Sequence, residues 1–409
     1  MQTQLADFIR DTPEGREAEA ILRKCVHCGF CTATCPSYQV LGDDLDSPRG
    51  RIYLIKRALE GAPVSAKTQL HLDRCLTCRA CETTCPSGVR YGRLLDIGRG
   101  LVEARAQRGG FDRLARRLLA SVLVRPRLFK VLTGLGRLAR PLLPAAVKAK
   151  VPGKVVPPGD WPAPRHARKM LVLGGCVQPG LAPSINAAAA RVLDRFGISL
   201  VEAPRAGCCG ALRFHLNYQQ EGRDDMRALI DAWWPLVERG EVEAIVMTAS
   251  GCGATVKEYG HLLAHDPAYR DKAARIAGLT KDLAEVIPFD ALPSGIAAGR
   301  IAFHSPCTLQ HGQQVRGAAE SRLARAGFEL TAVRDAHLCC GSAGTYSLLQ
   351  PGIAGELRSR KLEALGEGRP EQIATANIGC LTHLQGAAQV PVRHWIEILE
   401  EALQRKIPL

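Results

Sequence analysis

Cysteines grouped at short, regular spacing are the residues of this sequence most able to do chemistry. Two nests share the pattern C-x2-C-x2-C-x3-C-P, and each cysteine of the second nest stands 50 positions after its counterpart in the first. The first nest is Cys25, Cys28, Cys31 and Cys35, and the second nest is Cys75, Cys78, Cys81 and Cys85. The N-terminus carries charges and lacks an apolar signal region, so we expect a reducing compartment. There, metal binding or redox chemistry is a better explanation of sixteen cysteines than disulfides.

The spacing within each nest is that of two-cluster bacterial ferredoxins, in which the fourth cysteine of a run ligates the other cluster. It therefore predicts two 4Fe-4S clusters with crossed fourth ligands. One is held by Cys25, Cys28, Cys31 and Cys85, and the other by Cys75, Cys78, Cys81 and Cys35. Neither nest is complete alone, which explains why the chain has two.

Structural zinc is the alternative for the nests, because zinc also binds C-x2-C pairs. Zinc sites draw two ligands from each of two separated pairs, whereas each nest here offers three or four closely set thiols and a proline. We favour the clusters. His27, between two cysteines, is expected to orient its neighbours rather than to bind metal.

The C-terminal half carries a second repeated pattern of cysteines. In each copy a cysteine at a strand end is followed 32 positions later by a CCG triplet and then by a further cysteine. The first copy is Cys176, Cys208, Cys209 and Cys252, and the second is Cys307, Cys339, Cys340 and Cys380. Loops at the carboxyl edge of a parallel sheet are where open α/β folds bind ligands, so each set is expected to converge. We treat these eight as candidate ligands of one or two additional iron-sulfur clusters.

Periodicity indicates which elements position these cysteines. Ile52, Ile55, Ala58 and Leu59 follow helical spacing between the nests, and short apolar runs alternate with helical stretches beyond residue 169. The expected fold is multidomain, an all-α ferredoxin-like domain followed by two repeated α/β lobes with parallel sheets. The expected boundaries are 1–100, 101–168 for a basic helical segment and a Pro-rich linker, 169–300 and 301–409.

Two longer stretches carry a resemblance to a known family. KCVHCGFCTATCPSYQVLGDDLDSPRGRIYLIKRAL and LDRCLTCRACETTCPSGVRYGRLLDIGR resemble the iron-sulfur subunits of bacterial glycolate oxidase, and the likeness continues through the C-terminal half. The resemblance implies a complex with two flavoprotein-like subunits that oxidises glycolate to glyoxylate and passes electrons to a quinone or similar acceptor. The C-terminal repeats are similar to the CCG domains of heterodisulfide reductase and related redox subunits.

The chain departs from the heterodisulfide reductase pattern at one position in each repeat. That pattern closes with CxxC, whereas Thr255 and His383 stand three residues after Cys252 and Cys380. The missing fifth cysteines leave enough thiols for a cubane cluster in each repeat. Redox-active thiols without iron, and purely structural cysteines, remain alternatives. His304 and His337 are expected to orient the thiols.

Charge is unevenly distributed along the 409 residues. The net charge is +14, and residues 99–169 contain seventeen Lys or Arg against three acidic residues. Leu and Val alternate with Arg there at helical spacing, so the segment predicts an amphipathic surface that contacts either an anionic membrane or acidic partner subunits. No apolar run reaches the ~18 residues of a membrane span. We expect a cytoplasmic protein, with a peripheral contact on the inner face of the cell membrane as one interpretation.

Several classes of function are disfavoured by what the sequence lacks. It has neither a GxGxxG nor a GxxxxGK[ST] motif, and its basic residues are not interleaved with aromatic residues as in nucleic-acid binding. Clusters pass single electrons while oxidation of a hydroxy acid removes two, so a flavin is expected on a partner subunit. The chain then acts as an electron-transfer subunit that is inactive alone. Alternatives are the iron-sulfur subunit of a lactate or glycerol 3-phosphate dehydrogenase complex, or a heterodisulfide-reductase-like thiol enzyme; the SPRGR stretch at 47–51 favours the glycolate version.

Overall fold

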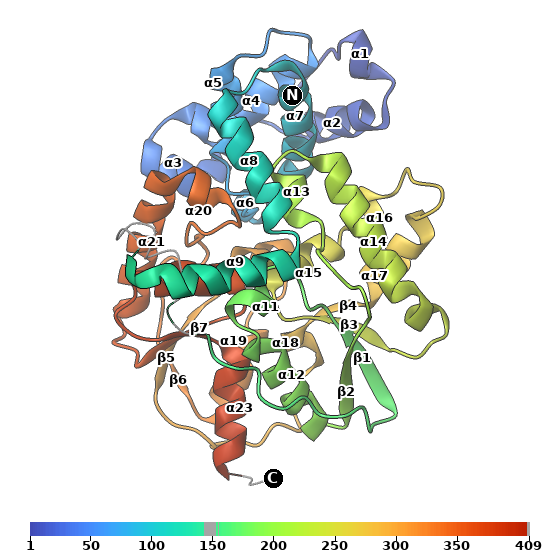
Figure 1. Cartoon of the computed structure of the whole chain (residues 1–409). Coiled ribbons are helices and arrows are strands. Elements are labelled where there is room, and N and C mark those ends of the chain that lie inside the picture. The colour runs from blue at the N-terminus through green and yellow to red at the C-terminus, as the bar shows by residue number, and fades with distance from the viewer. Residues whose placement is uncertain (143–152, 154, 407–409) are drawn as a thin grey trace.

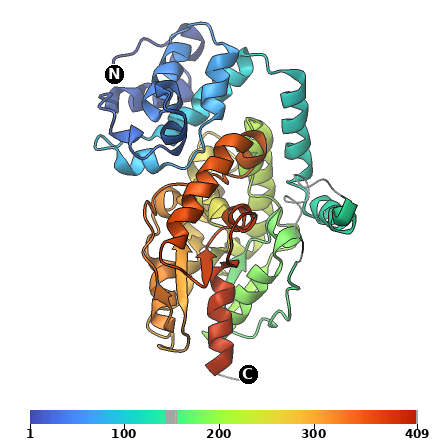
Figure 2. The ribbon, with the colours of Figure 1, turned by 90° about the vertical axis from the view of Figure 1, so that its left-hand side faces the viewer.

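The computed structural model describes residues 1–142, 153 and 155–406. A helical unit lies at one end of the molecule, two α/β lobes lie side by side beneath it, and a two-helix arm runs along one side (Figures 1 and 2). The first part of the predicted Pro-rich linker falls on residues 143–152 and 154, which lie outside the described residues.

The N-terminal helical unit, called the ferredoxin unit below, confirms the all-α expectation. Helix α4 begins where the Ser47 hydroxyl accepts from the Gly50 amide at 3.0 Å and Pro48 occupies the first turn. Its buried Ile52 and Ile55 pack in one core with leucines of α7. The described elements are α1 (Asp7–Arg10), α2 (Pro13–Lys24), η1 (Phe30–Thr32), α3 (Pro36–Leu41), η2 (Asp44–Asp46), α4 (Pro48–Leu59), α5 (Ala66–Asp73), α6 (Ala80–Thr84) and α7 (Tyr91–Arg105). The boundary expected at residue 100 falls inside α7.

The arm that follows consists of α8 (Gly110–Val122), α9 (Pro126–Ala139) and η3 (Arg140–Leu142). Helix α8 is tied to the ferredoxin unit by inward ion pairs of Arg116, which lies in the helix, and of Arg108, which lies just before it. Arg108 and Arg116 are buried, and both pair with Asp73 of α5, at 2.6 and 2.9 Å. These two arginines stabilise the docking of α8 and do not contribute to an exposed basic surface.

Each α/β lobe is built on a four-stranded parallel sheet among the described residues, with strand orders β2-β1-β3-β4 and β6-β5-β7-β8. The identical order confirms the internal repeat. The first lobe contains β1 (Arg168–Val172), α11 (Gln178–Leu181), α12 (Ser184–Arg195), β2 (Ile198–Glu202), α13 (Ala211–His215), α14 (Gln219–Glu238), β3 (Ala244–Met247), α15 (Ser250–Val256), α16 (Tyr259–Leu262), α17 (Arg270–Leu279), β4 (Thr280–Asp282) and α18 (Leu283–Val286). The second lobe contains β5 (Arg300–His304), the π turn η4 (Thr308–Gly312), α19 (Ala318–Ala326), β6 (Glu329–Leu330), α20 (Tyr346–Leu349), α21 (Pro351–Gly366), β7 (Gln372–Thr375), α22 (Ile378–Gln385), β8 (Val392–His394) and α23 (Trp395–Lys406).

The two lobes share one hydrophobic core. Buried residues of α12 and of α23, including Ile185 and Leu399, belong to the same cluster. His394 at the end of β8 is fully buried and its Nε2 lies 2.9 Å from the Thr248 carbonyl oxygen of the first lobe. The lobes are therefore packed as one body, and the carboxyl ends of their strands lie toward the ferredoxin unit (Figure 1).

The ferredoxin unit contacts both lobes through side chains next to its second nest. Arg79 pairs with Glu258 of the first lobe, with Nη2 to Oε2 at 2.8 Å. Toward the second lobe, Tyr346 donates its hydroxyl to the Arg74 carbonyl at 3.1 Å. These contacts bring the second nest to the carboxyl edge of the two sheets, where the repeated cysteines lie.

Candidate metal centres

The first predicted cluster set comes together around one small pocket. Its wall includes all four predicted ligands, Cys25, Cys28, Cys31 and Cys85. The fourth thiol comes from the second nest, as the crossed arrangement requires. Cys28 is exposed, and so are its neighbours Val26 (70%) and Phe30 (62%), so this pocket opens at the surface.

Left-handed backbone turns at equivalent positions of the two nests orient the cysteine side chains. His27 and Thr77, which occupy the same position in the repeat, both adopt left-handed conformations, with φ of 58° and 53°. Gly29 and Arg79 do so at the next matching position, with φ of 87° and 60°. Left-handed residues between cysteines turn successive side chains toward a common centre and form concave backbone sites that suit anions. The role of His27 is therefore explained by its backbone.

The second predicted cluster set is buried. Cys75, Cys78 and Cys81 are each less than 10% exposed, and Cys35 joins them from the first nest, close enough to interact electrostatically with Cys78 and Cys81. The Tyr91 hydroxyl and the Thr77 amide each lie 3.5 Å from the Cys75 sulfur. Hydrogen bonds to cluster sulfurs of this kind help to set a reduction potential.

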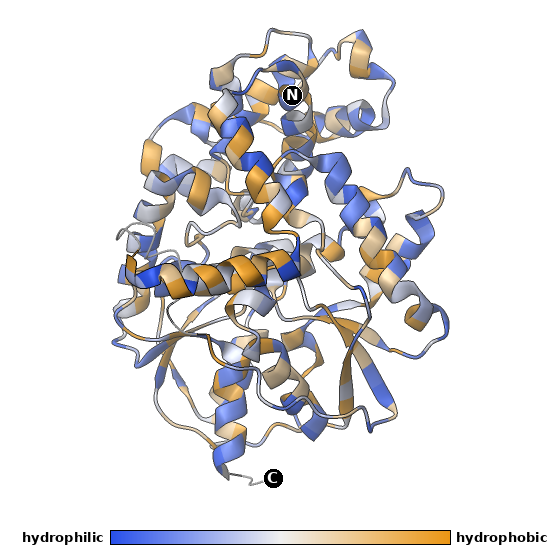
Figure 3. Ribbon diagram, viewed as in Figure 1, coloured by the Kyte–Doolittle hydropathy of each residue, from blue (hydrophilic) through white to orange (hydrophobic). Residues whose placement is uncertain are grey.

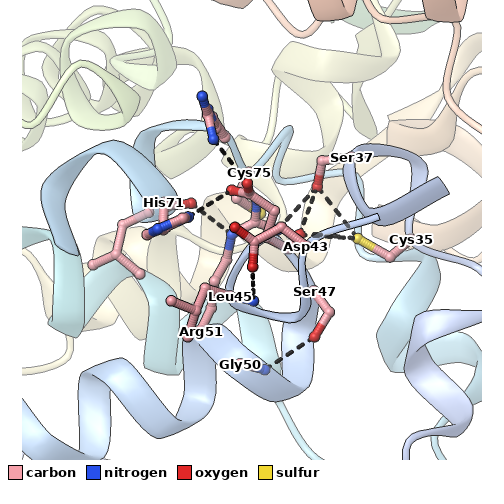
Figure 4. A network of polar contacts seen from close by, with 12 residues as sticks. Cys35, Ser37, Asp43, Leu45, Ser47, Gly50, Arg51, His71 and Cys75 are labelled. Atoms are coloured by element: carbon pink, nitrogen blue, oxygen red, sulfur yellow. Dashed lines mark hydrogen bonds and ion pairs between the residues drawn. The ribbon is translucent and has the colours of Figure 1, made fainter. Parts of the chain in front are cut away.

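A buried arginine faces the same sulfurs (Figure 4). Arg51 is fully buried; its Nη1 lies 4.0 Å from the Cys35 sulfur and 3.0 Å from the Ser37 hydroxyl. Its Nη2 pairs with the fully buried Asp46 at 3.3 Å, and its Nε donates to the His71 carbonyl at 2.7 Å. This network explains the SPRGR stretch, since it fixes a positive charge beside the second set.

The glycine of that stretch is required by close packing. A Cβ on Gly50 would lie 2.0 Å from the Asp44 carbonyl oxygen, so the first turn of α4 can approach η2 only without a side chain. The approach places Asp46, at the end of η2, within reach of Arg51 and of Arg74, whose Nη1 donates to it at 2.9 Å.

The protonation chemistry of both sets fits metal clusters. Burial, followed by the nearby Cys25 thiol, raises the pKa of Cys31 to about 11. Burial also raises the pKa values of Cys78 and Cys81, and the Cys307 thiol of the second lobe adds to the effect at Cys78. Without a cation these thiols stay protonated; iron supplies the positive charge that makes their thiolates stable.

Two structural constraints require glycine as the third residue of each CCG triplet. Gly210 and Gly341 are left-handed, with φ of 81° and 89°, and their amides lie 3.4 and 3.5 Å from the Cys208 and Cys339 sulfurs. A Cβ would also lie 2.4 Å from the Gly222 carbonyl oxygen at the first site. The triplet therefore turns a backbone donor onto a thiol.

Each set of repeated cysteines converges at the carboxyl edge of its sheet. In the first lobe, sulfur contacts run from Cys176 to Cys208, to Cys209 and on to Cys252. The second lobe repeats this order in Cys307, Cys339, Cys340 and Cys380, with 3.7 Å between the first two sulfurs.

A cavity of about 1050 Å³ separates the two sets and is lined by both. Cys176, Cys209, Cys252, Cys307, Cys339 and Cys380 contribute to its mostly apolar wall, together with Cys78 of the ferredoxin unit. Cys78, Cys307 and Cys339 also belong to one packed cluster, so the second cluster set directly adjoins the second lobe.

The positions of the missing fifth cysteines are occupied by residues engaged with the backbone. Thr255 donates its hydroxyl to the Gly251 carbonyl at 3.2 Å, and His383 Nε2 lies 3.2 Å from the Ala354 carbonyl oxygen. Of the two histidines expected to orient thiols, His304 lies beside Cys340 and Cys380, while His337 contributes its carbonyl oxygen to His311.

Sequence reasoning missed Arg51 and Tyr91. Both lie on helices at positions where arginine and tyrosine are ordinary, and only the tertiary structure brings them to the second set. The one available signal was the SPRGR stretch, which combines a helix N-cap, a proline and two arginines.

Comparisons with known proteins agree with this arrangement. A family described as a 4Fe-4S dicluster domain matches residues 21–89, and one described as a cysteine-rich domain matches residues 170–257 and 301–385. The glycolate oxidase iron-sulfur subunit of Escherichia coli K12 is 56% identical over 408 residues, covering 99% of this chain and 100% of that protein. A probable glycolate oxidase iron-sulfur subunit of Bacillus subtilis 168 is 28% identical, covering 90% of each. Lactate utilization protein A of Geobacillus thermodenitrificans is 25% identical but covers only 53% of this chain.

The fold and the paired nests define an iron-sulfur electron-transfer protein with a dicluster domain, which carries two 4Fe-4S clusters. The chain belongs to the family of glycolate oxidase iron-sulfur subunits.

Exchange of the crossed ligands tests the assignment of each cysteine. We expect Cys35→Ser to disturb the cluster bound mainly by the second nest, because Cys35 lies with Cys78 and Cys81. Cys85→Ser should instead disturb the cluster of Cys25, Cys28 and Cys31. Paramagnetic resonance of the reduced protein distinguishes the two, since the wild type should hold about eight irons in two interacting clusters in this unit. Loss of the first-nest signal in Cys35→Ser would contradict the crossing.

Removal of the buried positive charge of Arg51 should shift the reduction potential of the second cluster. Arg51→Gln is expected to lower the potential of the second cluster by on the order of 50 mV, because about 1 kcal/mol of attraction to the reduced, more negative state is lost. Redox titration followed by paramagnetic resonance measures this. Arg51→Lys, which keeps the charge, should shift it less, and Arg49→Gln, on the partly exposed side of the same stretch, serves as the control. An unchanged potential in a folded Arg51→Gln protein would exclude the electrostatic role.

Proposed function

We propose that the chain carries electrons from a flavin on partner subunits, which oxidise glycolate to glyoxylate, to a quinone-type acceptor. The observation that carries this is the unbroken succession of cysteine sets. It begins at the exposed first nest, continues through the buried second set and reaches, through Cys78, the cavity that the first-lobe thiols also line. The eight nest cysteines act as cluster ligands in the crossed arrangement described above.

The surface around the first nest suits the entry of electrons from a partner. Val26 and Phe30 expose apolar side chains beside Cys28. Exposed apolar residues next to a redox centre favour protein docking, because their burial stabilises a complex while bringing the cofactors close. The flavoprotein subunits would dock here.

The glycolate assignment draws on the relatives. A relative that is 56% identical over nearly the whole of both chains is called a glycolate oxidase iron-sulfur subunit. The lactate utilization relative matches about half of this chain at 25% identity. The missing fifth cysteines weigh against a heterodisulfide-reductase-like enzyme, and no observation favours glycerol 3-phosphate as substrate.

The first-lobe set, Cys176, Cys208, Cys209 and Cys252, would hold a further iron-sulfur cluster. Three of these four thiols line the large cavity, and hydrogen bonding among neighbouring thiols, together with burial, raises the pKa values of Cys176, Cys208 and Cys209. The same cavity would admit the acceptor, since a mostly apolar wall suits a quinone ring.

The arm offers a surface for contact with the membrane. Leu128, Val131, Leu132, Leu135 and Leu138 form an exposed stripe along α9, visible as an apolar face in Figure 3. Its other face is packed, since Phe129 lies against Gly180 of α11 so closely that a Cβ there would approach to 2.9 Å. Among the described residues, no helix has both the length and the apolar character needed to cross a bilayer.

The basic surface is smaller than the sequence suggested. Arg99, Arg108 and Arg116 are buried, so they cannot contact lipid. Exposed positive residues remain at Arg125, Arg127, Lys130 and Arg137, beside the apolar stripe of α9. This combination of an apolar stripe and flanking positive charge is typical of helices that lie in a membrane interface.

Reconstitution tests the electron path. The isolated chain should not oxidise glycolate, because no flavin motif is present, and glycolate-dependent dye reduction should appear only when the flavoprotein subunits are added. Phe30→Asp should lower this partner-dependent rate at least tenfold while leaving the iron content unchanged, and Phe289→Asp on an exposed site of the first lobe should not. Glycolate turnover by the isolated chain would refute the proposal.

An iron count tests the first-lobe cluster. The fully reconstituted chain should contain more than the roughly eight irons of the dicluster unit. Cys209→Ala should remove the excess and leave the dicluster signals intact. An iron content that stays the same in this variant would assign the first-lobe thiols to structure.

Flotation with vesicles tests the arm. The assembled complex should bind vesicles that contain anionic lipid, and binding should fall with salt, because each nearby Lys or Arg contributes ~1 kcal/mol. Leu135→Ser combined with Leu138→Ser should abolish binding, and Gln at Arg125, Arg127, Lys130 and Arg137 should remove its salt dependence. Loss of complex assembly in the leucine variant would identify the stripe as a subunit contact.

A further inference from the structure

The second lobe contains a compact group of three metal-binding side chains. A ring nitrogen of His304 and the sulfurs of Cys340 and Cys380 all lie within 4.8 Å of one another. His304 ends strand β5, Cys340 belongs to the CCG triplet, and Cys380 lies in the first turn of α22. Three different segments thus bring one donor each to a single point.

His304 has no other partner to explain its position. The residue is only 2% exposed, and its Nε2 is buried with no hydrogen-bond partner. A buried imidazole nitrogen without a partner is costly, so a ligand for it is expected.

The spacing of the donors selects a single ion over a cluster. Thiolates that share one zinc ion at about 2.3 Å lie ~3.8 Å apart, whereas those of a cubane cluster each cap a different iron and lie farther apart. Among the described residues, one other group of three possible ligands is equally compact, namely Asp43, Asp46 and His71. Both carboxylate oxygens of Asp46 already accept hydrogen bonds from Arg51 and Arg74. The nests and the first-lobe set contain no such trio; the first lobe has the same order of sulfur contacts but no histidine beside them.

Comparison of the two lobes isolates the histidine as the decisive difference. Leu173 occupies the position of His304 in the first lobe, since each lies three residues before the first cysteine of its set. Leu173 is buried in a hydrophobic core. The same fold therefore accepts either side chain, and only the second lobe carries a nitrogen donor at this point.

We propose that the second lobe binds a single zinc-type divalent ion through His304, Cys340 and Cys380. Cys339, whose thiol contacts that of Cys340, is the nearest side chain for the fourth position of a tetrahedral site. Zinc has no redox chemistry, so the site fixes the carboxyl edge of the second lobe beside the second cluster and transfers no electrons.

Metal analysis of the full-length chain, purified without oxygen from cells supplied with iron and zinc, tests this proposal. About one zinc per chain is expected, and zinc-edge X-ray absorption should show sulfur ligands together with one imidazole nitrogen. His304→Leu, which copies the first lobe, should weaken zinc binding at least tenfold in competition with a chromophoric chelator. Iron content and the paramagnetic signals of the dicluster unit should not change.

His337→Ala is the matched control, because His337 lies near the CCG triplet but outside the trio, and its zinc affinity should equal that of the wild type. If His304→Leu does not accumulate, His304→Cys should retain zinc with an all-sulfur absorption spectrum. Absence of zinc from the wild type, equal zinc affinity in His304→Leu, or loss of iron in place of zinc would each overturn the proposal. These outcomes are independent of the electron path, since glycolate-dependent activity is not part of the measurement.

Discussion

Burial of several thiolates side by side is the constraint on which this structure depends. Burial disfavours the charged form of a thiol, and each neighbouring thiol makes the next harder to ionise; together these effects raise the pKa values of Cys31, Cys78 and Cys81. The chain offsets this with metal cations, with backbone amides turned inward by left-handed residues, and with the buried guanidinium of Arg51. Nearly every unusual backbone feature of the nests and of the CCG triplets serves this need.

The crossed ligands give the same constraint a structural consequence. Cys85 lines the pocket of the first nest, and Cys35 lies close to Cys78 and Cys81, so clusters bound in the proposed crossed arrangement would each join two segments about 50 residues apart. In that arrangement, metal ligation would contribute directly to the folding of the ferredoxin unit. Because the second set also packs against Cys307 and Cys339, closure of the unit prepares the surface that meets the lobes.

The sequence predicted those features that depend on local spacing. The offsets of 50 and 32 identified both repeats, and periodicity located α4 and the strands. Contacts between distant segments were beyond its reach, such as the hydrogen bond between Tyr346 and Arg74. Buried polar residues were equally hidden, because an arginine at position 51 or a histidine at position 304 looks like any other until the fold removes water from around it.

The position of each charged residue along the arm decides its role more than the overall composition does. Residues 99–169 carry a charge equal to the net charge of the whole protein, yet their arginines divide between two roles. Arg108 and Arg116 turn inward to Asp73 and also share Asp112, and Arg108 pairs with Glu103 as well, so these buried cations are compensated by a network of carboxylates. The exposed residues of α9, by contrast, keep their charge in water beside an apolar stripe. The arm is thus anchored by one group of positive charges and presents another, and the amphipathic surface exists because α8 is held in place by the buried pairs.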